Sequence, residues 1–342
     1  MKSTDFSKHL SKFFKIYLVS DCNLSENTIN SYSYTFSEFL KFMKNKNNIE
    51  ANKIKLENFN RETIQNFLRF LGEKGNTEST INQRQAAINS FCKYLRYEEP
   101  GLANEIDSIL SIKRRKCQRK SISYMKVDGM NLFLKQIDTT SYQGLRDFVM
   151  MSIMLTTGVR VSELINIKVK DVQLSEPATI KVFGKGRKER IISISPKIVP
   201  FIKLYIEKNN INSQVNNDKY MFMSHLNKKF TRHGVGYIVA KYRDMARSIS
   251  PDLIPDDISC HKLRHSCGVA MVNSGLELIY LRDILGHESV ETTQMYAGTR
   301  DSDVKKEALD RVAGQIIDEN EDIKPIWNED IELVDFLNSF KK

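Results

Sequence analysis

Apolar residues recur at spacings of three and four along the first hundred positions, the pattern of amphipathic helices that each bury one stripe. Four such stripes are present, at residues 6–18, 32–43, 67–71 and 81–95. The polar run that begins at Thr77 precedes the fourth stripe and has the residue types that cap helix N-termini. This part of the chain is therefore predicted to be a small helical bundle.

The pattern becomes mixed after residue 122. Residues 144–156 are apolar at helical spacing, and Gly158 follows as a helix stop. Two β-branched runs, 179–183 and 190–194, flank a Gly-Lys-Gly-Arg-Lys segment and predict a β-hairpin. Further helices are expected at 196–208, 231–249, 261–274, 277–285 and 289–297, and one or two more within 302–341. We expect a mainly α chain with one small antiparallel β element.

The chain has 342 residues, more than one typical domain. Between the two patterns lies the run Lys-Arg-Arg-Lys-Cys-Gln-Arg-Lys at 113–120, which carries charge without apolar periodicity. Such a run is either a solvated hinge or a strap against phosphates, and we favour the strap. The sequence therefore predicts a helical domain at 1–112 and a basic linker at 113–121. A mixed α+β domain at 122–300 and a C-terminal helical tail at 301–342 follow.

The formal net charge of +10 favours a polyanionic partner such as nucleic acid, because neutralised phosphates release condensed counterions. The five cysteines are scattered without a C-x-x-C pair, which argues against a disulfide framework or a zinc ribbon. No secretory leader and no apolar run long enough to span a membrane is apparent. The expected location is the cytoplasm, without a membrane partner.

Arg160 is the first candidate for chemistry, in the block Thr157-Gly158-Val159-Arg160-Val161-Ser162-Glu163-Leu164. A guanidinium group can hold two phosphate oxygens at once, which a lysine cannot do. The alternative is a surface arginine that pairs with Glu163 three positions later.

A second candidate cluster is His261-Lys262-Leu263-Arg264-His265, near the start of a helix with Ser259 as its predicted cap. His261 and Arg264 are three apart and share a face, whereas Leu263 is expected in the core. A metal site of Cys260, His261, His265 and Cys267 is the weaker interpretation, because the H-E-x-x-H glutamate is missing and Arg264 repels cations.

A third candidate pair is His287 and Tyr296. His287 follows Gly286, the stop of the preceding helix, and Tyr296 comes nine residues later. A tyrosine taken alone is more often a packing residue, and this chain has 13 of them.

Taken together, these motifs resemble the tyrosine recombinase (phage integrase and Xer-like) family. That family has an arginine in a T-G-x-R-x-S-E-L block, a hairpin lysine, H-x-L-R-H, L-G-H and then a tyrosine. Residues 122–300 resemble its catalytic domain and residues 1–112 its SAM-like core-binding domain. The six matching positions, in order, are Arg160, Lys185, His261, Arg264, His287 and Tyr296.

The match is incomplete at two places. Tyr296-Ala297-Gly298 and His265-Ser266-Cys267 differ from the usual Y-T-H and H-T-F, which leaves the subfamily open. Residues 278–283 resemble members that are carried by transposons and other mobile elements.

The resemblance implies that Tyr296 attacks a DNA phosphodiester, leaving a 3′-phosphotyrosine and a 5′-hydroxyl, without ATP, metal or any other cofactor. Arg160 and Arg264 would hold the phosphate, His261 and His287 would assist, and Lys185 would protonate the leaving oxygen. Glu163 would orient its neighbours. Lys185 has an alternative role in a basic hairpin that contacts the DNA backbone. Residues expected to contact DNA are Lys113, Arg114, Arg115, Lys116, Arg119, Lys120, Arg187, Lys188 and Arg232.

The implied partners are double-stranded DNA with paired sites, further copies of the chain (a dimer on one site and a tetramer in synapsis), and an accessory protein that bends DNA or sets direction. The tail at 301–342 would dock on a neighbouring copy or pack on its own domain. Two other functions stay open: DNA relaxation of the type IB topoisomerase kind, and DNA-binding regulation without catalysis. A metal-dependent relaxase is disfavoured because the chain has no H-x-H motif.

Overall fold

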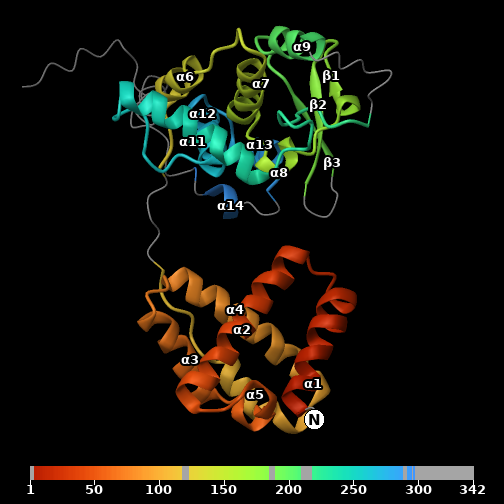
Figure 1. The fold of residues 1–342 in the computed structure, drawn as a ribbon, viewed down its shortest axis with the longest axis vertical. Helices are drawn as coiled ribbons and strands as arrows, with labels where there is room; N and C mark the ends of the chain where they lie inside the picture. Colours follow the sequence, from red (N-terminus) through yellow and green to blue (C-terminus); the bar gives the residue numbers. More distant parts are fainter. Residues whose placement is uncertain are drawn as a thin grey trace, which may run out of the picture. The chain divides into compact units, whose positions relative to one another are not determined.

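A computed structural model of the chain describes residues 4–117, 123–184, 189–208, 218–287, 291–294 and 296. The chain divides into two compact units, Met1–Lys120 and Ser121–Lys342 (Figure 1). Within the described residues, no helix combines the length and the apolar character that a membrane span requires.

The first unit is a helical bundle around an aromatic core, as predicted. Rings from four helices meet edge to face, for example Phe13 with Phe91 at 5.1 Å and Phe39 with Phe67 at 5.4 Å between centroids. Its helices are α1 Asp5–Lys12, α2 Glu26–Asn47, α3 Arg61–Glu73, α4 Glu78–Glu98 and α5 Ala103–Leu110, with a π-helix at Phe13–Asp21 and short 3₁₀ turns at Ala51–Lys53, Leu56–Asn58 and Pro100–Leu102.

The sequence pattern was right about most of these helices and wrong about one detail. Thr77 caps α4, with its hydroxyl accepting from the N–H of Thr80. The first stripe, however, was read as one α-helix, whereas the helix widens to π geometry after Lys12. The π-helix buries Phe13 and Leu18, which are five apart, whereas the apolar residues Phe14 and Tyr17 between them also fit an α-helical spacing.

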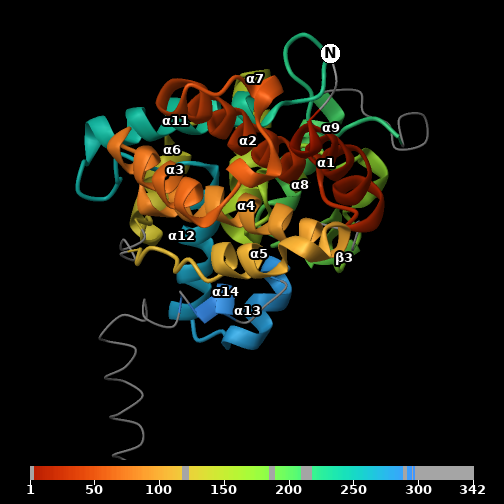
Figure 2. The same ribbon diagram turned by 90° about the horizontal axis from the view of Figure 1, so that it is seen from below.

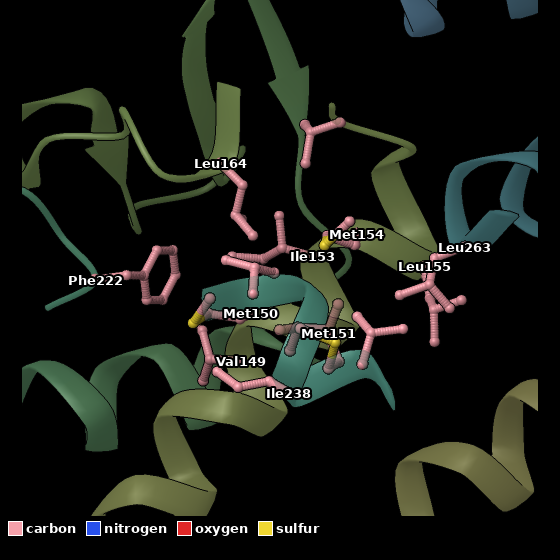
Figure 3. Packing of buried hydrophobic residues seen from close by; sticks show 14 of the residues in the cluster. Val149, Met150, Met151, Ile153, Met154, Leu155, Leu164, Phe222, Ile238 and Leu263 are labelled. Atoms are coloured by element: carbon pink, nitrogen blue, oxygen red, sulfur yellow. The ribbon is translucent and has the colours of Figure 1, made fainter. Parts of the chain in front are cut away.

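The second unit is built around α7 (Tyr142–Thr157), which has 12 of its 16 residues buried and is therefore covered on nearly every side. Figure 3 shows its side chains meeting those of Leu164, Phe222, Ile238 and Leu263 from surrounding segments. The other helices are α6 Val127–Lys135, α8 Val161–Leu164, α9 Val199–Lys208, α11 Arg232–Ile249, α12 Cys260–Asn273, α13 Leu278–Leu285 and α14 Glu291–Gln294.

The sheet of this unit has three antiparallel strands in the order β1 (Val172–Gln173), β2 (Thr179–Phe183) and β3 (Glu189–Ser193). It stands at one side of the unit, with α11 and α12 toward the other (Figures 1 and 2). The predicted hairpin is β2–β3, and β1 was not foreseen because a two-residue strand leaves no periodic signal.

The mainly α fold with a small antiparallel sheet is thus confirmed. The expected helix at 289–297 is described only as the four-residue α14, and α9 begins three residues later than predicted. The expected helices at 302–341 lie outside the described residues.

Candidate active site

Arg160 lies where the chain turns from α7 into α8. Gly158 ends α7 with φ +64°, and a Cβ there would collide with the side chain of Leu285, so both conformation and space require glycine. The backbone N–H and Nη1 of Arg160 donate to the two carboxylate oxygens of Glu163, each at 2.9 Å. The predicted pair with Glu163 is therefore present. It does not remove Arg160 from solvent, because the side chain remains 39% exposed.

Helix α12 carries His261 and Arg264 three positions apart on one face, and it packs against α7. Leu263 is fully buried, as predicted from the spacing. The Arg264 guanidinium is buried too, and it donates to the carbonyl oxygens of Gly158 at 2.7 Å and Leu285 at 2.6 Å. Ser259 occupies the N-cap position, but its hydroxyl does not cap the helix as predicted.

The C-terminal end of α13 brings His287 close to Arg160 and Arg264. Gly286 ends the helix with φ +63°, the predicted left-handed stop. The last carbonyl oxygens of a helix have no partner within it. Here the Leu285 carbonyl accepts from Arg264 and the Gly286 carbonyl accepts from Arg160 Nη2 at 3.0 Å, so two arginines fix the backbone from which His287 projects.

Tyr296 lies against α12 and is 1% exposed. Its hydroxyl is 2.7 Å from Nδ1 of His265, and its ring lies parallel to that of His287 with 6.5 Å between centroids. A Cβ at Gly268 would lie 2.8 Å from the Tyr296 ring. Gly268 and His265 are three apart, so one face of α12 provides both the space for the ring and the partner for the hydroxyl.

The electrostatic environment favours an anion. Burial lowers the pKa of Arg264 to about 10, with Arg160 as the next cause, so Arg264 stays charged at neutral pH. Burial followed by the charge of Arg264 lowers the pKa of His287 to about 4 and also lowers that of His261. Burial raises the pKa of Tyr296 to about 12, although Arg264 opposes the rise. A bound phosphate would supply the missing negative charge.

The remaining predicted residues belong to other segments of the chain, and several lie outside its described part. Lys185, Arg187, Lys188, Arg119 and Lys120 lie outside the described residues. Lys113, Arg114, Lys116 and Arg232 are exposed, as a phosphate contact requires. Arg115 differs, because its guanidinium donates to the Leu68 carbonyl at 2.9 Å and pairs with Glu78 within the first unit.

Sequence reasoning missed two residues of this site. It quoted His265 without giving it a role, although its spacing of four from His261 was the available signal. It also gave no role of its own to Arg190, which was included in the β-branched run 190–194. The signal there was an arginine two residues before Ile192, on the face of the strand that is otherwise apolar.

The competing metal interpretation of Cys260, His261, His265 and Cys267 finds no geometric support. In the part of the chain that the structure describes, no three histidine, cysteine, aspartate or glutamate side chains gather closely enough to hold an ion. The His261 and His265 rings meet edge to face at 4.2 Å, and His265 is directed to a phenol.

The fold and the comparison with known proteins together define the class, an enzyme that breaks and rejoins DNA by a tyrosine mechanism. The model of the phage integrase family matches residues 123–303, and that of the phage integrase N-terminal SAM-like domain matches residues 12–99. The chain belongs to the phage integrase family and is a tyrosine recombinase. The resemblance seen in the sequence is thereby confirmed.

Individual relatives are similar over most of the chain. The tyrosine recombinase XerC of Herpetosiphon aurantiacus is 33% identical over 83% of this chain and 88% of its own length. The tyrosine recombinase XerD of Staphylococcus haemolyticus is 29% identical over 83% and 91%. In fold, the chain is similar to the XerH site-specific recombinase bound to palindromic difH substrate in a post-cleavage complex, with a TM-score of 0.65 and 21% identity over 90% of this chain and 82% of that one.

Stability should depend on the histidines of this site. Burial, followed by the His261 charge for His265 and the Arg264 charge for His287, lowers both pKa values from 6.5 to about 4. Between these values the unfolded chain binds protons that the folded chain does not. The free energy of unfolding should therefore fall, by roughly 2–3 kcal/mol for each histidine, as the pH drops from 6.5 to 4. Denaturant titration across this range measures the slope. The slope should flatten when both residues are replaced by asparagine, and an unchanged slope would assign it to other groups.

Proposed function

We propose that this recombinase exchanges strands between paired double-stranded DNA sites by attaching DNA transiently to Tyr296. The observation that supports the proposal is that Arg160 and Arg264 both donate to the end of α13, just before His287, whose ring lies parallel to that of Tyr296. The charges of the same two arginines act on His261. The phenol oxygen attacks a phosphodiester, a 3′-phosphotyrosine forms, and a 5′-hydroxyl leaves. A 5′-hydroxyl of the partner strand reverses the step, so one ester replaces another and ATP is not needed.

In this proposal Arg160 and Arg264 hold the nonbridging oxygens of the phosphate. The Arg160 side chain retains exposure toward solvent, while Arg264 is a buried cation that donates to two neutral carbonyl oxygens. Both can therefore stabilise the added negative charge of the pentavalent transition state. Glu163 orients Arg160 through two hydrogen bonds.

The histidines would handle hydrogen bonds and protons. Because their pKa values are lowered, His261 and His287 are neutral in the free protein and can each accept or donate a hydrogen bond. His261 would accept the phenolic proton or bond the phosphate, and His287 would donate to a phosphate oxygen. The Tyr296 hydroxyl would exchange its bond with His265 for the phosphate when DNA binds.

Lys185 is proposed as the acid that protonates the departing 5′ oxygen. An alkoxide is far more basic than a phenolate, so the leaving group needs an acid more than the nucleophile needs a base. The family resemblance supports this role, since Lys185 stands between the two glycines of the hairpin sequence.

The wider organisation belongs to the same proposal. Residues 1–112 and the catalytic domain at 122–300 would each contact DNA, with the linker at 113–121 along the DNA backbone. Arg187, Lys188 and Arg232 would add phosphate contacts. The tail at 301–342 would dock on a neighbouring copy in a dimer on one site and a tetramer in synapsis, with an accessory DNA-bending or directionality protein. The cytoplasm is the proposed location, and a mobile element the proposed carrier.

The decisive experiment uses a nicked suicide substrate. Candidate sites are the inverted repeats or duplicated junctions that flank the gene, and the nick lets a short 5′-hydroxyl fragment diffuse away after cleavage. We expect a covalent protein–DNA band on a denaturing gel, and recombinant product when two intact sites are supplied. Relaxation of plasmids that lack the site, without exchange, would instead indicate a type IB topoisomerase, and binding without a covalent band would indicate a regulator.

A further inference from the structure

Arg190 is the second residue of β3 and points to the inner face of the sheet. It is paired in register with Val182 and lies two residues before Ile192, both of which are buried. Side chains two apart on a strand share a face, so Arg190 enters the unit instead of facing solvent. Its side chain is only 16% exposed, whereas that of Lys181 on the neighbouring strand β2 is 40% exposed.

The Arg190 guanidinium makes a bidentate contact with the Glu163 carboxylate. Nη1 donates to one carboxylate oxygen at 2.9 Å and Nη2 to the other at 2.8 Å. Burial opposes ionisation of Glu163, but the hydrogen bonds from Arg190 and the backbone of Arg160 outweigh it and hold the pKa of the carboxyl below its ordinary value. Glu163 is thus a fixed carboxylate shared by Arg190 and Arg160.

A second set of contacts involves the end of α13. Arg190 Nε donates to the Ile284 carbonyl at 3.2 Å, Arg264 Nη2 to the Leu285 carbonyl and Arg160 Nη2 to the Gly286 carbonyl. Three arginines from three different segments therefore occupy three successive carbonyl oxygens, just before His287. The fit is close, because a Cβ on Gly286 would lie 2.9 Å from Arg190 Nη1.

We propose that Arg190 is a positioning residue for strand cleavage, which sets the orientation of Arg160 through the shared Glu163 carboxylate. The inference rests on the proposed function of Arg160 as a phosphate ligand. The nitrogens of Arg190 are directed to Glu163 and Ile284, so it acts through these groups and not on DNA. Without it, the carboxylate keeps Arg160 as a partner but loses the bidentate contact that fixes its own rotamer.

Arg190→Lys is the informative variant. A lysine keeps the charge but offers one nitrogen, so it cannot reach both carboxylate oxygens and the Ile284 carbonyl together. We expect single-turnover cleavage of the suicide substrate to slow about 100-fold, the scale that small misplacement of a catalytic group produces. DNA affinity should stay at the wild-type level.

A methylphosphonate substrate separates positioning from general loosening. Replacing one nonbridging oxygen by methyl removes the negative charge that Arg160 is proposed to hold. The penalty of Arg190→Lys should therefore shrink at least tenfold on this substrate, in parallel with that of Arg160→Lys. A variant that merely loosens the unit would show the same penalty on both substrates.

Arg146→Lys is the matched control. Arg146 also forms a buried pair, with two nitrogens on the Asp147 carboxylate and a third on the Met223 carbonyl, but within the core beside Phe230. It should lower the melting temperature comparably and leave the cleavage rate unchanged. If Arg190→Lys does not fold, Arg190→Met combined with Glu163→Leu removes both partners without leaving a buried charge, and should show the same phosphodiester-specific loss.

Two results would overturn the proposal: cleavage of the phosphodiester by Arg190→Lys within about threefold of wild type, or equal penalties on the two substrates. Both are read against wild-type protein that forms the covalent band. A wild-type protein that forms no such band on any flanking site would count against the proposed function instead, so the two failures are distinguishable.

Discussion

Tyr296→Phe is expected to bind the recombination site with wild-type affinity and to form no covalent adduct. The phenyl ring can occupy the same space against Gly268, whereas the attacking oxygen is gone. The covalent band on the nicked substrate should therefore disappear, a loss of at least about 10⁴-fold, as expected for removal of a nucleophile. The variant loses one buried hydrogen bond to His265, which lowers the free energy of unfolding by about 1–3 kcal/mol.

Tyr280→Phe is the matched control for this loss. Tyr280 is on α13 of the same unit, and it is 58% exposed. Removal of its hydroxyl should change neither binding nor adduct formation. A covalent band that persists in Tyr296→Phe would show that another oxygen attacks the DNA, and the assignment of the nucleophile would then fail.

The elements that carry the site were predictable because each has a local signal. The apolar run of α7, the glycine stops at Gly158 and Gly286, and the alternation of the β2–β3 hairpin depend on neighbours within a few residues. The π-helix after α1 was not predicted, because the apolar residues of this segment also fit spacings of three and four.

The hydrogen bonds that join the candidate residues to one another could be predicted less well from the sequence. Spacing predicted the pair of Arg160 with Glu163 but not the third member, because Arg190 is 27 positions away in the chain. The bond between His265 and Tyr296 joins residues 31 apart. Pattern reasoning identifies which side chains face inward, but which inward groups meet is decided by the packing of α12, α13 and the sheet.

The arrangement of these connections also explains why the site can hold cationic groups so close together. Arg160 and Arg190 share Glu163, whereas Arg264 has the carbonyl oxygens of Gly158 and Leu285. Backbone dipoles orient a guanidinium without cancelling its charge. The positive charge of Arg264 therefore remains able to attract an anionic ligand, and the guanidinium is already oriented before that ligand binds.

Arg264→Ala is expected to lower the cleavage rate about 10³-fold and leave site affinity nearly unchanged. Its buried charge acts mainly in the transition state, where the phosphate gains negative charge, and removal of one such donor costs this much in comparable sites. The substitution also leaves the Gly158 and Leu285 carbonyls without their donor. Some loss of stability, about 1–3 kcal/mol for each group, is therefore expected alongside the kinetic effect.

Arg146→Ala separates these two effects, since it removes a buried arginine that also donates to a backbone carbonyl, that of Met223. If stability were the cause, both variants would cleave equally slowly at the same fraction of folded protein. Single-turnover rates and binding isotherms for both variants decide the matter. Loss of binding in Arg264→Ala with a normal rate for the residual complex would make Arg264 a docking residue, because a group that acts in the transition state changes the rate at saturation.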